Sequence, residues 1–324
     1  MVALAAKTVA SSSLPVIDVA GLGGDFAARR TIAQELRTAC VDTGFFYIKG
    51  HGVPAALITQ VFQQSRAFFA LSMEQKLALA SANSRCRHGY EPLKAQTLEL
   101  GAPPDLKEGY LAGDDFAADH PAVLNDPVNI GPNQWPPQLP SFKEAMTSYV
   151  DQMKGLGKTL MQGLALSLDL DEDYFDAFCH DPVLTLRLLH YPPQPANHAP
   201  NEKGCGAHTD WGGITILLQD DAGGLQVQHA DGSWISAPPI AGTFVVNIGD
   251  LLARWTNNLY RSTVHRVVNI SGRDRYSVPF FLDGQSDHMV SCLPSCASEG
   301  RHFADTTVRG HLEEMVRRTY AAAG

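Results

Sequence analysis

The sequence lacks the segments that would carry a protein into or across a membrane. No stretch approaches the ~20 apolar residues that a membrane span requires. Residues 1–13 contain one lysine and no apolar core of signal-peptide length. The chain also has no internal repeat and no low-complexity segment. These absences predict a soluble cytoplasmic protein.

Positive charge is scarce as well. The chain has 25 Lys and Arg residues against 34 Asp and Glu residues, a net charge of −9, and no basic run of five residues. Nucleic acids and anionic membranes bind basic patches, so we expect neither as a partner. The 324 residues are 44% hydrophobic, which suffices for a full core. We expect one domain over residues 1–324; the sequence is compatible with a monomer but does not set the oligomeric state.

Cysteine is present at six positions in a chain without an export signal, which favours reduced thiols over disulfides. The one close pair, Cys292 and Cys296, flanks Pro294 and lacks zinc-knuckle spacing. Cys205 lies three residues before a histidine, and a buried, small apolar side chain is its expected role.

The segment 204–213 carries the strongest chemical pattern. His208 and Asp210 are two residues apart, so in an extended backbone their side chains point to the same face. The segment 262–268 offers a second imidazole, His265. Two histidines and one carboxylate on one side of a metal leave its other side open, which is typical of non-haem Fe(II) oxygenases.

A second His-x-Asp pair, His229 and Asp231, shows that this spacing alone is weak evidence for a metal site. Asp231 precedes Gly232 between two strand-like runs, residues 225–229 and 234–236. A Gly-containing turn between two such runs is typical of a β-hairpin. We therefore predict a turn here and a metal site at His208.

Arg275 and Ser277 form a third element. They are two residues apart on a strand-like run, and an arginine with a hydroxyl binds carboxylates through charge-assisted hydrogen bonds. The run follows His265 after the turn 271–274. We predict two adjacent antiparallel strands that bring this carboxylate clamp close to the metal. Such a site suits a chelating keto acid.

Residue periodicity predicts a mixed α+β fold. The first ~180 residues favour helices at 27–40, after Pro54, after a capping box at 72–75, at 141–168 and at 174–179, with strands at 15–19, 45–48 and 108–111. Short strands follow at 185–191, 214–219, 225–229, 234–236, 243–248, 263–270 and 276–282, before a final helix at 307–322. Many short strands at this spacing indicate a sandwich or jelly roll.

Taken in order along the chain, these motifs resemble the Fe(II)- and 2-oxoglutarate-dependent dioxygenases of the isopenicillin N synthase-like family. The resemblance also covers residues 14–18, 42–53, 187–193 and 247–250. Residues 187–192, 249–255 and 262–268 are most similar to thymine 7-hydroxylase-like members. The resemblance implies an N-terminal dioxygenase region over 14–120, a double-stranded β-helix (jelly-roll) core over 180–285, a long central helix and a C-terminal helix.

The resemblance also implies roles for single residues. It makes His208, Asp210 and His265 the catalytic Fe(II) ligands, and it makes 2-oxoglutarate and O2 co-substrates. Arg275, Ser277 and Tyr191 would bind 2-oxoglutarate, and oxidation of a substrate C–H bond would release succinate and CO2. Many plant members have asparagine where this chain has Leu189.

The substrate is expected to be a small, ring-containing molecule. In the thymine 7-hydroxylase-like interpretation, Trp211 and Phe281 sandwich a flat ring and Arg187 bonds to a ring carbonyl. The alternative is that Phe281 belongs to the core and Arg187 balances an internal carboxylate. Two other functions stay open at this point: an iron oxidase of the same fold that consumes no 2-oxoglutarate, and a non-catalytic binding protein.

Overall fold

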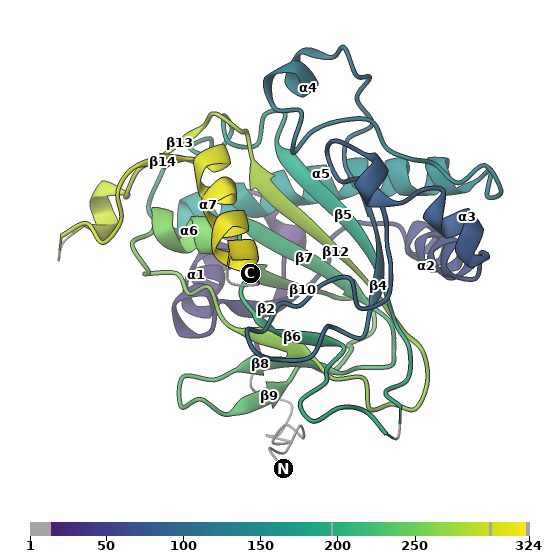
Figure 1. Cartoon of the computed structure of the whole chain (residues 1–324). Helices are drawn as coiled ribbons and strands as arrows, with labels where there is room; N and C mark the ends of the chain where they lie inside the picture. The colour runs from purple at the N-terminus through teal and green to yellow at the C-terminus, as the bar shows by residue number, and fades with distance from the viewer. Residues whose placement is uncertain (1–13, 196, 298–299, 322–324) are drawn as a thin grey trace.

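A computed structural model of the chain describes residues 14–195, 197–297 and 300–321. The fold is mixed α/β, with two β-sheets facing each other and helices on the outer face of the larger one (Figure 1). Within the described residues no helix is both long and apolar enough to cross a membrane.

The larger sheet has eight strands, and all of its pairs are antiparallel except the first. In spatial order the strands are β1 (Val16–Asp18), β2 (Phe45–Lys49), β10 (Phe244–Ile248), β7 (Ile214–Gln219), β12 (Arg275–Gly284), β5 (Val183–Tyr191), β4 (Glu108–Ala112) and β3 (Gly89–Glu91).

The smaller sheet has four antiparallel strands, in the order β6 (Cys205–His208), β11 (His265–Val267), β8 (Leu225–Gln228) and β9 (Trp234–Ser236). A two-stranded ribbon joins β13 (Met289–Val290) to β14 (Thr306–Thr307). The predicted turn at His229 and Asp231 is confirmed, because it connects the paired strands β8 and β9 and Gly232 has φ +80°.

The α-helices are α1 (Phe26–Asp42), α2 (Ala55–Phe69), α3 (Met73–Leu77), α4 (Pro121–Asn125), α5 (Phe142–Ser167), α6 (Asp250–Trp255) and α7 (Val308–Ala321), with 3-10 turns at Ala20–Gly23, Ser81–Asn83 and Pro294–Cys296. Helices α2 and α5 contact the larger sheet, and α1 packs on α5 (Figure 1). The predicted capping box at Ser72 and Gln75 is confirmed at the start of α3.

Helix α5 forms the centre of the main core. Its apolar residues recur every three or four positions, so Met146, Tyr149, Met153 and Leu160 lie on one buried stripe. The stripe packs against β7 and β12, whose Val278, Phe280 and Leu282 point toward the helix. Because side chains alternate along a strand, the odd-numbered residues of β12 point the other way, into the space between the sheets.

Two sequence predictions were wrong. Residues 174–179 form successive turns and not a helix: the amide of Tyr174 donates to Asp171 O and that of Asp176 to Asp173 O, both three residues back. The spacing of Phe175 and Phe178, which suggested a helix, anchors these turns in the core.

Strands β11 and β12 are not neighbours, contrary to the second prediction. They lie in different sheets, and residues 271–274 carry the chain from one sheet to the other. The side-chain amide of Asn269 holds this crossing, because it donates to the carbonyls of Tyr191, Pro192 and Arg273. The crossing still places the two strands on opposite walls of one cavity.

Candidate metal and co-substrate site

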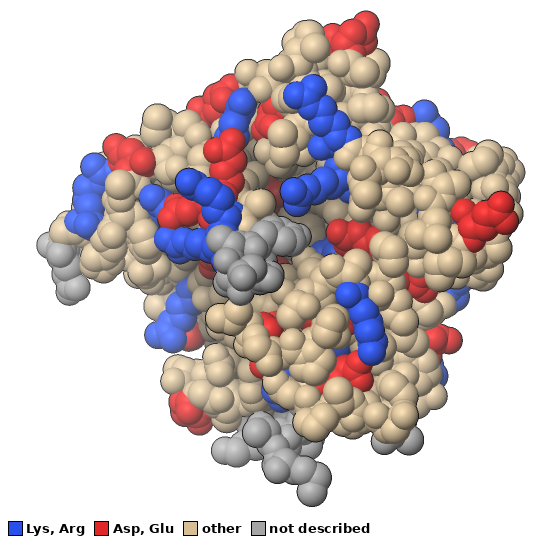
Figure 2. Space-filling view, viewed as in Figure 1, with Lys and Arg blue, Asp and Glu red and all other residues tan. Residues whose placement is uncertain are grey.

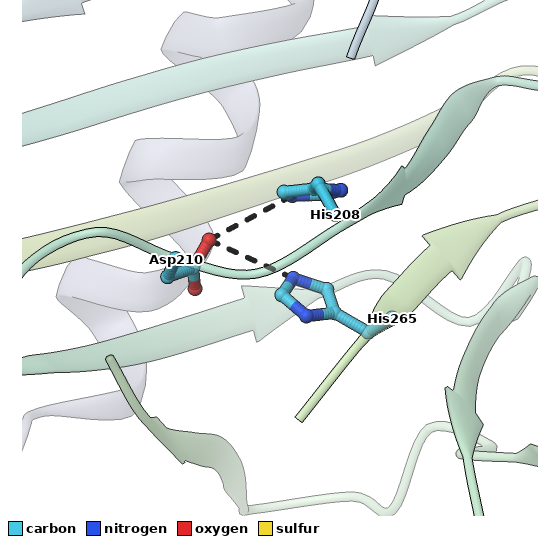
Figure 3. Close-up of side chains that lie close together, drawn as sticks. All are labelled: His208, Asp210 and His265. Atoms are coloured by element: carbon cyan, nitrogen blue, oxygen red, sulfur yellow. Dashed lines mark ion pairs between the residues drawn. The ribbon is translucent and has the colours of Figure 1, made fainter. Parts of the chain in front are cut away.

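His208, Asp210 and His265 converge between the two sheets. His208 ends β6 directly opposite His265 on β11, and Asp210 follows two residues later. Asp210 Oδ1 lies 3.7 Å from Nε2 of each histidine (Figure 3). Metal bonds to nitrogen and oxygen are about 2.0–2.2 Å long, so atoms at this separation can share one ion. The spacing and chemistry of the three side chains therefore fit a metal with an open face.

Backbone carbonyls fix the orientation of both imidazoles. Nδ1 of His208 lies 2.8 Å from Gly206 O, and Nδ1 of His265 lies 3.1 Å from Thr263 O. Because Nδ1–H donates there, each Nε2 presents its lone pair to the centre of the triad. Burial lowers the pKa of both rings, and with the neighbouring His208 it lowers that of His265 to about 4. Both imidazoles are therefore neutral at pH 7, as metal binding requires.

Two side chains from the larger sheet orient the Asp210 carboxylate. The Thr215 hydroxyl donates to Asp210 Oδ2 at 2.6 Å, and the Asn247 amide donates to the same oxygen at 2.8 Å. Thr215 and Asn247 are register partners on β7 and β10, so they point to the same side. Burial raises the pKa of Asp210, but the two imidazoles and these hydrogen bonds outweigh burial, so the pKa lies below its ordinary value. The carboxylate is thus ionised, with Oδ1 directed at the histidines.

The start of α6 holds the loop that carries Asp210. The amide of Asp250 donates to Asp210 O at 2.7 Å, and the Asp250 carboxylate accepts from Thr209 at 2.9 Å. A Cβ on Gly249 would lie 2.1 Å from Gly212 O, so only glycine fits there. Residues 247–250, which match the family pattern in sequence, therefore position the loop that carries Asp210.

Replacing Thr215 by valine is expected to weaken metal affinity about 10- to 100-fold, because it removes one of the two hydrogen bonds that orient Asp210 and nearly preserves side-chain shape. Titration of the variant and the wild type with Mn(II) measures the metal affinity of each. Thr243→Val is the matched control, since its hydroxyl bonds only to the exposed Ile240 carbonyl. Equal affinity in Thr215→Val and the wild type would contradict the role of this hydrogen bond.

A 60 Å³ cavity adjoins the triad and lies between the two sheets. Tyr191, Arg275 and Ser277 line it. Arg275 is 1% exposed; its guanidinium donates to Ser277 Oγ at 3.0 Å and Gly223 O at 2.6 Å, and lies 4.7 Å from the Tyr191 ring centroid. Its predicted partner Ser277 is thus confirmed as a neighbour on the same wall.

Two other cations line this cavity, and both have carboxylate partners. Lys107 pairs with Asp105, and its Nζ lies 3.3 Å from the Cys205 thiol, whose pKa burial raises to about 11. Arg187 pairs with Glu91. Among the described residues, Arg275 has no carboxylate partner. Of the three cations in this cavity, Arg275 is therefore the one whose charge a bound anion would neutralise.

A second cavity of 220 Å³ opens from the other side of the triad. It shares His208, Asp210, Arg187 and Phe281 with the first cavity, and Trp211 lies on its wall. The pairing of Arg187 with Glu91 agrees with the interpretation that it balances an internal carboxylate. Phe281, Trp211 and Arg187 nevertheless all face this space.

Helix α7 forms part of the wall of this second cavity. Leu312 lines it, and His311 Nε2 donates to the carbonyl of Trp211 at 2.9 Å. Figure 2 shows a hollow on this face beside α7, with Lys and Arg side chains along its upper rim. The triad thus lies between the small cavity that contains Arg275 and a larger one that opens toward the surface.

Comparison with known proteins gives two family matches. Residues 14–138 match the N-terminal region of non-haem dioxygenases in morphine synthesis, and residues 182–284 match the 2OG-Fe(II) oxygenase superfamily. Both matched segments contribute to the larger sheet, and the second contains the triad and Arg275.

Relatives that align with nearly the whole chain lead to the same family. The chain is 42% identical to the 2-oxoglutarate-Fe(II) type oxidoreductase hxnY of Emericella nidulans over 96% of this chain and 90% of hxnY. It is 40% identical to the 2-oxoglutarate-dependent dioxygenase citB of Monascus ruber over 97% and 98%. A Neurospora crassa protein, solved in complex with alpha-KG and thymine, has a TM-score of 0.83, 32% identity and coverage of 97% and 98%. The chain therefore belongs to the 2OG-Fe(II) oxygenase superfamily and is a 2-oxoglutarate-dependent dioxygenase.

Proposed function

We propose that His208, Asp210 and His265 bind the Fe(II) of this dioxygenase. Their convergence, with both Nε2 lone pairs and Asp210 Oδ1 directed at one point, is the observation that carries the assignment. The bound metal, with dioxygen and 2-oxoglutarate, supplies oxidation of a substrate C–H bond with release of succinate and CO2. The chain contributes neutral imidazoles, an oriented carboxylate and an open face toward both cavities.

We further propose that Arg275 and Ser277 bind the distal carboxylate of 2-oxoglutarate. A buried arginine without a carboxylate partner is costly, and a carboxylate ligand supplies the missing charge. Tyr191, buried beside Arg275, is placed to donate its hydroxyl to the same co-substrate. The apolar Leu189 also lines this cavity, so it shapes the cavity without donating a hydrogen bond.

For the architecture, we infer that the two sheets between residues 180 and 285 form a distorted jelly roll. The N-terminal region, over 14–120, adds β1 to β4 to the edges of the larger sheet. One hydrophobic core joins α1, α5 and the strands of both regions, which supports a single domain. Localisation in the cytoplasm stays a prediction.

We also infer that the substrate is a small, ring-containing molecule bound in the 220 Å³ cavity. Trp211 and Phe281 offer aromatic surface next to the triad, where a C–H bond must lie to be oxidised. The Neurospora crassa protein was solved with thymine, a flat ring, which supports a substrate of this shape. Arg187 is placed to contact the ring while remaining paired with Glu91.

A screen of ring compounds for substrate-stimulated succinate release tests this function. We expect release that requires Fe(II), 2-oxoglutarate and oxygen together, and that a chelator abolishes. Substrate oxidation without 2-oxoglutarate would instead identify an iron oxidase of the same fold. Tight ligand binding without any turnover across the screen would identify a binding protein.

A further inference from the structure

Asp283 places a carboxylate in the wall of the larger cavity. It lines the same space as Trp211 and Phe281. Among the described residues it has no hydrogen-bond donor and no ion-pair partner. The buried acidic side chain Glu108 differs, because it bonds to Lys76, Tyr90 and His190.

The position of Asp283 follows from the alternation along β12. Arg275 and Ser277 line the co-substrate cavity, Phe281 lines both cavities, and Asp283 lines the larger cavity. One strand thus runs from the co-substrate clamp, past the triad, to this carboxylate. A Cβ on Gly212 would lie 1.6 Å from Asp283 Oδ1, so the carboxylate packs directly on the backbone that follows Asp210.

Asp283 is partly exposed, and its carboxylate faces the cavity. A ligand that fills the cavity displaces water from this carboxylate, and removing a charged group from water without giving it a donor is unfavourable. A ligand that brings a proton-bearing group to Asp283 would offset that cost. Arg187 on the cavity wall is not available for this, since Glu91 already neutralises it.

We propose that Asp283 is a specificity-determining residue that accepts a hydrogen bond from a proton-bearing nitrogen of the substrate, either an ammonium or amidinium group or a ring N–H. This inference rests on the proposed function, because the substrate must lie beside His208 and Asp210 to be oxidised. Positive N–H groups make the strongest hydrogen bonds to carboxylates. The aromatic surface of Trp211 and Phe281 would contact the remainder of the same molecule.

Benzamidine and acetophenone form a matched pair of probes, since both are flat and of similar size but only benzamidine has N–H groups. Calorimetric titration into the protein loaded with Mn(II) and 2-oxoglutarate measures their affinities without turnover. We expect the wild type to bind benzamidine at least about tenfold more tightly than acetophenone. Asp283→Asn should abolish this preference. Asp173→Asn, an exposed carboxylate, is the control and should keep it.

Substrate-independent conversion of 2-oxoglutarate to succinate separates this inference from the proposed function. If the wild type and Asp283→Asn both make succinate but bind the two probes equally well, Asp283 does not select nitrogen and the inference is overturned. The same holds if Asp283→Asn keeps the preference for benzamidine. If the wild type makes no succinate with Fe(II), 2-oxoglutarate and oxygen, the proposed function fails and the inference fails with it.

Discussion

Replacing Arg275 by glutamine is expected to raise the KM for 2-oxoglutarate by about 100-fold or more. Glutamine keeps much of the side-chain volume but removes the buried charge that has no carboxylate partner among the described residues. Losing one member of a buried, hydrogen-bonded charge pair costs about 2–5 kcal/mol, and each 1.4 kcal/mol is tenfold. Steady-state succinate formation at varied 2-oxoglutarate measures the effect.

Arg273→Gln is the matched control. Arg273 lies two residues earlier, is half-exposed and pairs with Asp221 outside the cavity. The KM of Arg273→Gln for 2-oxoglutarate should therefore stay unchanged. The melting temperatures of the two variants with and without co-substrate provide a second comparison. 2-Oxoglutarate should raise the melting temperature of Arg273→Gln but no longer that of Arg275→Gln. An unchanged KM for 2-oxoglutarate in Arg275→Gln would contradict the proposal that Arg275 binds its distal carboxylate.

Replacing His208 by alanine is expected to abolish iron binding and to lower succinate formation at least about 1,000-fold. The loss should exceed the ~10- to 100-fold effect of outer contacts such as Thr215, because a direct ligand is removed. Iron content after anaerobic reconstitution and desalting, together with the rate, measures both effects.

His229→Ala provides a stringent control for His208→Ala, since His229 and Asp231 repeat the same His-x-Asp spacing. In the structure that pair lies on the exposed turn between β8 and β9, with His229 Nδ1 3.2 Å from Asp231 Oδ1. Iron content and rate should both match the wild type. If His229→Ala lost iron and His208→Ala kept it, the metal site would lie elsewhere.

Local patterns of the sequence predicted much of this molecule. Strands such as β7 and helices such as α5 follow from apolar periodicity, and the spacing of Arg275 and Ser277 places both on one face of β12. These predictions succeed because neighbouring residues decide them. The pattern of His208 and Asp210 is local as well. Gly232 marks the similar pair at His229 as a turn, and the distant His265 completes the set of metal ligands.

The features that the sequence did not predict depend on pairing between distant segments. Thr215 and Asn247 meet at Asp210 because β7 and β10 are neighbours, and no local pattern gives that register. The expectation that β11 and β12 are adjacent was wrong because a short turn carries the chain between sheets as readily as within one. The lack of a partner for Asp283 within the described part of the chain is equally a property of the assembled cavity.

Anaerobic titration of the protein with Fe(II) and 2-oxoglutarate tests the central claim most directly, because the visible charge-transfer absorption arises only when the keto acid chelates a protein-bound iron through its open positions. The account predicts one iron and one 2-oxoglutarate per chain, an absorption lost in His208→Ala and His265→Ala, and an unchanged spectrum in His229→Ala. Full absorption in His208→Ala or His265→Ala would contradict it.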